Sequence, residues 1–132
     1  MTKYTEPKEV DTCIAFYEWA KWARFNGRPL SDFLFHIPNE RDCKIQTGVM
    51  LKKMGVTKGV TDYMLPIPVP PYCGLFMEFK RKPNKPAKEQ LDFIALMKSM
   101  GYAAVVVWNL EEAIRTVELY LTIPPEQLEA KP

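Results

Sequence analysis

Apolar residues recur at helical spacing in four stretches of the chain, with short apolar runs between them. The spacing predicts helices over residues 6–26, 47–54, 87–100 and 110–122. Gly27, Gly55 and Gly101 follow the first three helices, a common way for helices to end. Because the first helix is apolar nearly all round, we expect it to be buried on more than one side, and a subunit interface could cover the second side.

Four runs of strand-forming residues complete the pattern, at residues 33–37, 62–65, 74–80 and 102–108. The last run is continuous and valine-rich, which suits a strand buried on both faces. The proline-rich segment 66–71 cannot lie in the middle of a sheet, so we predict a long hairpin connection there. The resulting order of elements predicts an α/β fold, a mixed sheet flanked by helices.

The composition is that of a single globular domain over residues 1–132, with 47% hydrophobic residues. No apolar run approaches the ~20 residues needed to cross a bilayer, and the first residues lack the apolar segment of a signal peptide. Three widely spaced cysteines suit reduced thiols better than a disulfide framework. We therefore expect a cytoplasmic protein without a membrane partner, in the host cytoplasm if a phage encodes it.

The net charge of +2 hides an uneven distribution along the chain. Residues 41–90 carry ten Lys and Arg against four Asp and Glu, whereas the segments before and after carry net charges of −1 and −3. A basic middle third favours an anionic partner such as nucleic acid, although a solvated lysine-rich surface would give the same count. The candidate phosphate contacts are Lys52, Lys53, Lys58, Arg81, Lys82, Lys85 and Lys88.

The run 74–80 carries two charged residues on a strand that should be central. Side chains alternate along a strand, so Glu78 and Lys80 share one face and the apolar face opposite them must be core. Asp62 begins the preceding strand. If the two strands pair as a hairpin, the start of the first lies beside the end of the second, which brings Asp62, Glu78 and Lys80 to one edge.

Two carboxylates and a lysine form a set that can use a hard divalent cation. Carboxylate oxygens suit Mg²⁺, which prefers few protein ligands and keeps several waters. A metal-bound water is a better nucleophile, and a lysine can hold that water and offset charge on a phosphoryl group. The alternative for Glu78 and Lys80 is a surface ion pair, which contributes only about 0–1 kcal/mol.

The order of these motifs resembles a known family. Gly59-Val60-Thr61-Asp62, the strand motif Leu75–Lys80 and Glu89-Gln90 resemble the PD-(D/E)XK nuclease superfamily, and within it the stand-alone virus-type replication-repair nuclease domain (VRR-NUC) of phage and bacterial type. The run His36-Ile37-Pro38-Asn39-Glu40, the glycines at 48, 55 and 59, and Gly101-Tyr102 resemble the same family. The resemblance covers residues 9–121 and implies a restriction-endonuclease-like mixed sheet flanked by helices.

The resemblance also implies roles for individual residues. In the family the strand carboxylates hold the metal and the lysine assists the nucleophile, which maps onto Asp62, Glu78 and Lys80. The family's helical glutamine maps onto Gln90, and a helical glutamate near the N-terminus maps onto Glu9, so the implied metal set is Asp62, Glu78 and Glu9. The implied protein is a homodimeric DNA endonuclease that uses Mg²⁺ or Mn²⁺, cuts branched DNA such as Holliday junctions and leaves a 5′-phosphate.

Alternatives stay open for the residues outside the strand motif. Glu9 shares a helical line with Phe16 and Ala20, which predicts a buried stripe, but an acid in a first helical turn also interacts favourably with the helix dipole. Without the resemblance, Gln90 would be taken as a solvated helix residue. His36 fits a hydrogen-bonded neutral imidazole in the core better than a group that orients phosphate or water.

Thr61 stands where the family usually has proline. Proline there shapes the backbone and binds no metal, so we expect the chemistry to survive this departure.

Several other catalytic classes lack the residues that they need. A single histidine without a Cys-x-x-Cys pair argues against zinc, and no Gly-x-x-x-x-Gly-Lys loop is present for a nucleotide cofactor. Neither Ser31 nor Ser99 lies in a Gly-x-Ser-x-Gly elbow. Two alternatives to a nuclease remain, a module that binds branched DNA without cutting it and a metal-dependent hydrolase of small phosphates.

Overall fold

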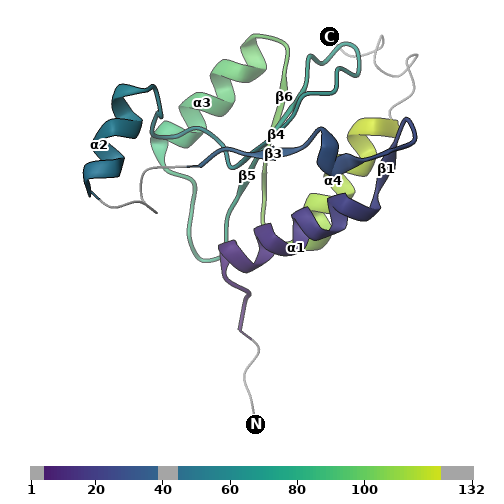
Figure 1. Cartoon of the computed structure of the whole chain (residues 1–132), viewed down its shortest axis with the longest axis horizontal. Helices are drawn as coiled ribbons and strands as arrows, with labels where there is room; N and C mark the ends of the chain where they lie inside the picture. The colour runs from purple at the N-terminus through teal and green to yellow at the C-terminus, as the bar shows by residue number, and fades with distance from the viewer. Residues whose placement is uncertain (1–4, 39–44, 123–132) are drawn as a thin grey trace.

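The computed structural model describes residues 5–38 and 45–122 and has a four-stranded mixed sheet between helices (Figure 1). The sheet order is β3-β4-β5-β6, in which β5 pairs antiparallel with β4 and parallel with β6. The strands of this sheet are β3 (Phe35–His36), β4 (Tyr63–Leu65), β5 (Leu75–Phe79) and β6 (Ala103–Val107). The helices are α1 (Glu9–Trp22), η1 (Leu30–Asp32), α2 (Ile45–Lys53), α3 (Lys88–Ser99) and α4 (Leu110–Thr122).

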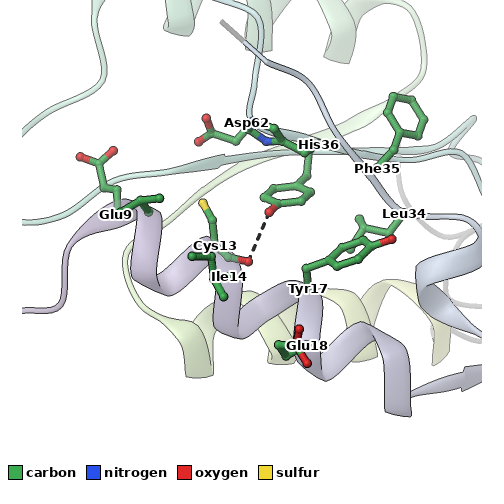
Figure 2. A pocket seen from close by; sticks show the side chains of 11 residues that line it. Glu9, Cys13, Ile14, Tyr17, Glu18, Leu34, Phe35, His36 and Asp62 are labelled. Atoms are coloured by element: carbon green, nitrogen blue, oxygen red, sulfur yellow. Dashed lines mark hydrogen bonds between the residues drawn. The ribbon is translucent and has the colours of Figure 1, made fainter. Parts of the chain in front are cut away.

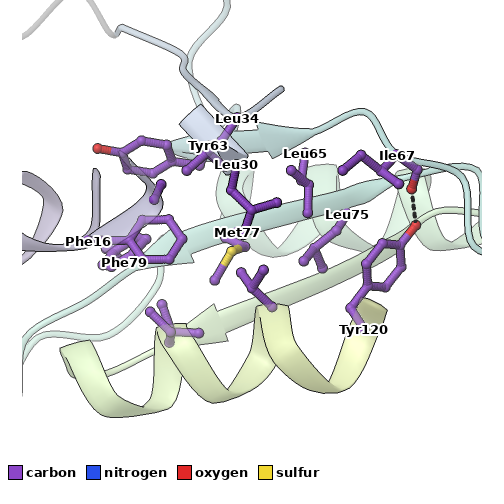
Figure 3. Packing of buried hydrophobic residues seen from close by; sticks show 14 residues of the cluster. Phe16, Leu30, Leu34, Tyr63, Leu65, Ile67, Leu75, Met77, Phe79 and Tyr120 are labelled. Carbon is purple, nitrogen blue, oxygen red and sulfur yellow. Dashed lines mark hydrogen bonds between the residues drawn. The ribbon is translucent and has the colours of Figure 1, made fainter. Parts of the chain in front are cut away.

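The larger hydrophobic core lies between the sheet and the pair of helices α1 and α4 (Figure 3). Met77 and Phe79 of β5 point into it, as the alternation along the strand predicts. The Phe16 ring of α1 lies 5.2 Å from the Phe79 ring, and the Tyr120 hydroxyl of α4 donates to the Ile67 carbonyl at 2.7 Å. These contacts hold α1 and α4 on one face of the sheet.

Helix α3 covers the opposite face over a smaller core. Phe76 of β5, Ala104 of β6 and Ile94 of α3 are its buried members. All five residues of β5 are buried, since helices cover both faces of this strand. Any polar side chain that faces α3 from β5 therefore needs partners inside the protein.

The predicted order of the main helices and strands is confirmed, and the interval predicted for the last helix matches α4. The hairpin between β4 and β5 is also confirmed, with Tyr63 opposite Met77. The strand predicted at 33–37 is shorter than expected because η1 and the residues that follow it turn the chain before β3 begins at Phe35. Within the described residues, no helix is both long and apolar enough to span a bilayer.

The prediction of one helix over residues 6–26 is wrong at both ends. The chain leaves the helix at Ala23, whose backbone is extended, and β1 (Arg24–Phe25) then pairs with β2 (Arg28–Pro29). Asn26 and Gly27 both have positive φ, at 50° and 76°. Asn-Gly is the preferred pair for a two-residue hairpin turn, so this dipeptide turns the chain rather than merely ending a helix.

The expectation that the first helix is buried on more than one side is also wrong for the single chain. Phe16 and Ala20 are fully buried, but Val10 and Ile14 are more than half exposed and Trp22 is 82% exposed. Helix α1 therefore presents apolar side chains that no described part of the chain covers.

Gly59 fits closely against the first turn of α3. Its φ is +95°, and a Cβ added there would lie 2.7 Å from the Glu89 carbonyl oxygen. At Gly27, which also has a positive φ, an added Cβ would meet nothing within 4 Å. Gly59 thus fixes the segment just before Asp62 to the start of α3.

We expect Gly59→Ala to lower the free energy of unfolding by about 2 kcal/mol or more, because it adds a backbone clash to the strain of a positive φ. Gly27→Ala is the matched control, with strain alone and a loss of about 1 kcal/mol. Urea denaturation of both variants measures the difference. Equal losses for the two variants would contradict the close packing of Gly59 on α3.

Candidate active site

Strand ends and helix starts lie together at one edge of the sheet, an edge formed by the ends of strands and not by an outer strand. Strand β4 begins at this edge and β5 ends there, because the two strands are antiparallel. Strand β6 is parallel to β5 and ends at the same edge, and α3 and α4 follow β5 and β6. In parallel arrangements of this kind, ligands bind at the carboxyl ends of the strands, so this edge is the natural candidate site.

Asp62 is held at this edge by the backbone of β5. Its Oδ2 atom accepts a hydrogen bond of 2.7 Å from the Phe79 N–H, and its own carbonyl accepts from the Ile37 N–H at 2.7 Å. Continued by one residue, the register that pairs Tyr63 with Met77 sets Asp62 against Glu78. The structure therefore brings Asp62 to the end of β5, as the hairpin prediction required.

Burial raises the pKa of the Asp62 carboxyl, and the nearby Glu9 carboxylate raises it further. The Phe79 N–H, His36 and Lys80 act in the opposite direction without cancelling the effect of burial. The environment of Asp62 therefore disfavours the charged form of its carboxyl, a common property of functional carboxylates.

Glu78 faces α3 and is almost fully buried, with 2% of its surface exposed. Its Oε2 atom accepts a hydrogen bond of 2.8 Å from the Gln90 Nε2 atom, and the Lys80 Nζ atom lies 3.9 Å from the same oxygen. The Lys80 side chain is only 9% exposed. Glu78 and Lys80 thus form a largely buried pair, so the alternative of a surface ion pair between them is wrong.

Gln90 connects Glu78 to the first turn of α3. Its Oε1 atom accepts a hydrogen bond of 2.8 Å from the Ala87 N–H, which helix geometry leaves without a helical partner. Its Nε2 atom donates to Glu78. Gln90 is buried, so the interpretation of this residue as a solvated helix position is wrong, and its two contacts set the orientation of the Glu78 carboxylate.

Glu9 lies at the start of α1, where it lines two neighbouring cavities. The larger, of about 780 Å³, also contains Asp62 and lies between α1 and the start of β4 (Figure 2). The smaller, of about 380 Å³, also contains Lys80. In Figure 2 the carboxylates of Glu9 and Asp62 lie at the same end of the larger cavity.

His36 is exposed, so the prediction of a core imidazole is wrong. Its ring lies 5.2 Å from the Tyr63 ring on the wall of the larger cavity, because β3 is an edge strand that leaves His36 open to solvent. Cys13 lines the same cavity, and burial raises its pKa to about 12, which disfavours thiolate chemistry there. Asn39 and Glu40 of the family-like run, and Cys43, lie outside the described residues.

The predicted phosphate contacts fall into two groups along the chain. The first group comprises Arg81, Lys82, Lys85 and Lys88, in and just after the β5–α3 loop; the second comprises Lys52, Lys53 and Lys58, at the end of α2 and in the loop after it. Lys58 lies 3.9 Å from Glu89, and Lys88 forms an ion pair with Asp92 at 2.7 Å. Their role in DNA binding stays a prediction.

Asp62 and Glu78 supply carboxylate oxygens, the ligand type that a magnesium-type ion prefers. Mg²⁺ takes one or two protein carboxylates and fills its other positions with water or phosphate oxygens. Over residues 5–38 and 45–122, no group of three or more His, Cys, Asp or Glu side chains is arranged to hold a metal. Glu9 therefore stays a prediction as a third ligand.

Trp108 is a residue that the sequence reasoning missed at this edge. It follows β6 directly and lines the smaller cavity beside Lys80 and Arg81. Its place at the carboxyl end of a parallel strand was the available signal.

No family model matches the sequence, and no curated protein matches it either. A solved structure named VRR_NUC domain protein matches the fold with a TM-score of 0.78 and 27% identity, over 89% of this chain and 90% of that chain. The resemblance to the VRR-NUC domain is confirmed. The mixed sheet with flanking helices matches that of this VRR_NUC domain structure, which suggests a nuclease-type domain. Asp62, Glu78 and Lys80 lie at one edge of the sheet.

Gln90→Leu should lower the free energy of unfolding by about 1–3 kcal/mol. The substitution leaves the Ala87 N–H without its acceptor and takes a donor from the buried Glu78. Lys98→Leu, on the exposed last turn of α3, should change stability by less than about 0.5 kcal/mol. If chemical denaturation gives Gln90→Leu the same stability as the Lys98 variant, Gln90 does not link the helix to Glu78.

The raised pKa of Asp62 predicts that the stability of the fold depends on pH. The unfolded chain releases this proton near the ordinary pKa of 3.8, whereas the fold retains it to higher pH, so stability falls as the pH rises between the two values. Asp62→Asn keeps an acceptor for the Phe79 N–H and removes the charge. In EDTA, its advantage in melting temperature over wild type should be greatest near pH 7.5 and vanish below pH 3.8. An advantage in melting temperature that grows as the pH falls would show that the fold lowers the Asp62 pKa rather than raising it.

Proposed function

We propose that the chain is a metal-dependent, structure-specific endonuclease that hydrolyses phosphodiester bonds in branched DNA such as Holliday junctions. The observation that carries the proposal is the convergence of Asp62, Glu78 and Lys80 on one edge of a VRR-NUC fold. In the proposed reaction a water attacks phosphorus, the bond from phosphorus to the 3′ oxygen breaks, and a 5′-phosphate and a 3′-hydroxyl remain.

Asp62 and Glu78 would hold Mg²⁺ or Mn²⁺, with Glu9 as a candidate third ligand. When bound, such an ion lowers the pKa of a coordinated water and screens the charge of the phosphate. Gln90 supports this role because it fixes the Glu78 carboxylate from α3. The Phe79 N–H does the same for Asp62 from β5.

Lys80 would position the attacking water and offset negative charge on the phosphoryl group. Its Nζ atom lies 3.9 Å from the Glu78 carboxylate, and its side chain is held in a largely buried setting. A preorganised cation of this kind is most effective where water is excluded, because the local dielectric is low.

The two groups of basic residues would contact the DNA backbone. Their sequence positions lie within the basic middle third, and phosphate contacts of this kind give affinity that falls with salt. The exposed apolar residues of α1, which include Val10, Ile14 and Trp22, support a homodimer.

A second candidate function is a module that binds branched DNA without cutting it. The contact of 3.9 Å between Glu78 and Lys80 favours it, because a lysine that neutralises the carboxylate could replace a metal ion.

Cleavage of a labelled four-way junction in Mg²⁺ or Mn²⁺ tests the proposal. Wild type should cut, and Glu78→Gln and Lys80→Met should each reduce the rate by about 100-fold or more. Glu78→Gln keeps an acceptor for Gln90, so the loss would reflect the missing charge rather than a lost hydrogen bond.

The matched control is Lys98→Met, which removes an exposed lysine from the last turn of α3 and should cut at the wild-type rate. Cleavage that survives both site substitutions would overturn the assignment of the site. Tight binding of the junction by wild type without any cleavage, in either metal, would establish the second candidate instead.

A further inference from the structure

Trp108 has no role in either hydrophobic core. Among the described residues, every other half-buried phenylalanine, tyrosine or tryptophan packs against the larger or the smaller core cluster. Trp108 instead follows the last residue of β6 and turns to the edge of the sheet. A large aromatic ring that is half-buried outside the core offers a flat apolar surface against which a ligand can pack.

The ring lines a cavity of about 380 Å³ that also contains Lys80 and Arg81. The Lys80 backbone N–H donates a hydrogen bond to the Val107 carbonyl at 2.9 Å. Trp108 is the next residue after Val107 and is therefore close to Lys80. Two cations and one indole therefore lie together at the ends of two parallel strands.

We propose that this cavity is a subsite for one nucleotide of the DNA strand, with its base stacked on Trp108 and its phosphate beside Lys80 and Arg81. The proposal rests on the proposed function and adds to it a recognition contact next to the scissile bond. Proteins that hold single strands combine cationic side chains for the backbone with aromatic rings for the bases.

The volume and the remaining lining fit one nucleotide rather than a run of phosphates. The cavity lies at the lower end of the range of about 300–1,000 Å³ typical of small-molecule sites. Glu6, Glu9 and Glu111 supply the other charges, so a phosphate is favoured only at the end formed by Lys80 and Arg81. The base is uncharged, and its amino groups can donate to carboxylates.

A base that stacks on Trp108 must be unpaired or unstacked from its neighbours. Unstacking costs least at a branch point or in a single strand, so the subsite would favour DNA with unpaired nucleotides next to the cut.

A thermodynamic cycle between the protein and the DNA tests the contact. The Kd of a branched DNA with unpaired nucleotides at its branch is measured by fluorescence anisotropy, with Ca²⁺ in place of Mg²⁺, for wild type and Trp108→Ala. Each protein is tested with the intact DNA and with DNAs that carry an abasic site at successive positions around the branch.

Trp108→Ala should weaken binding of the intact DNA about 5- to 100-fold, the range for loss of one stacked base. At one position, the abasic site should weaken binding to wild type by the same factor. Trp108→Ala with that abasic DNA should then bind no more weakly than with either change alone. Trp108→Phe keeps a ring and should restore most of the affinity. Additive effects at every position, or an unchanged Kd for Trp108→Ala, would overturn the proposal.

Leu119→Ala is the control, since Leu119 is an exposed apolar residue of α4 that does not line the cavity, and it should bind like wild type. If Trp108→Ala melts well below wild type, Trp108→Leu takes its place in the cycle, because leucine keeps apolar bulk without a stacking face.

The failure of this proposal and that of the nuclease function have different signatures. Cleavage of the junction in Mg²⁺ together with an additive cycle would leave the nuclease and remove the nucleotide subsite. A non-additive cycle in a protein that cuts no DNA would keep the subsite and remove the nuclease.

Discussion

The hydrogen bond from the Phe79 N–H to the Asp62 carboxylate is the interaction on which the site depends. It joins the start of β4 to the end of β5, at a point between Glu78 and Lys80. Without it, the Asp62 backbone would still be held by Ile37, but no hydrogen bond would hold its carboxylate against the strand motif. The bond offsets part of the desolvation that raises the Asp62 pKa, so a charge disfavoured by burial is fixed where a cation would neutralise it.

The rest of the fold serves to keep a second carboxylate beside the first. Helices cover both faces of β5, so Glu78 can exist there only with partners, and α3 supplies Gln90 through its first turn. Gly59 allows the segment before Asp62 to approach that same turn. The packing of α3 on the sheet therefore orients Glu78 and also brings Asp62 into place.

Local patterns predicted the strands, the last helix and the pairing that brings Asp62 to Glu78, because alternation and hairpin geometry depend on few residues. They failed where one residue type suits two structures. Asn26-Gly27 fits a helix end or a hairpin turn, and only the pairing of the flanking residues decides. His36 was assigned to the core because its neighbours are apolar, but the exposed edge of a sheet is a property of strand order. The position of Trp108 beside Lys80 follows from the parallel pairing of β6 with β5, which the sequence alone does not show.

We propose that Asp62 and Glu78 hold one divalent cation between them. Crystals soaked in Mn²⁺, with data collected at a wavelength where manganese scatters anomalously, would locate that cation. An anomalous peak should lie within bonding distance of both carboxylates, and crystals of Glu78→Gln should have no such peak. A peak bound elsewhere, or none between Asp62 and Glu78 at saturating Mn²⁺, would rule out a shared cation.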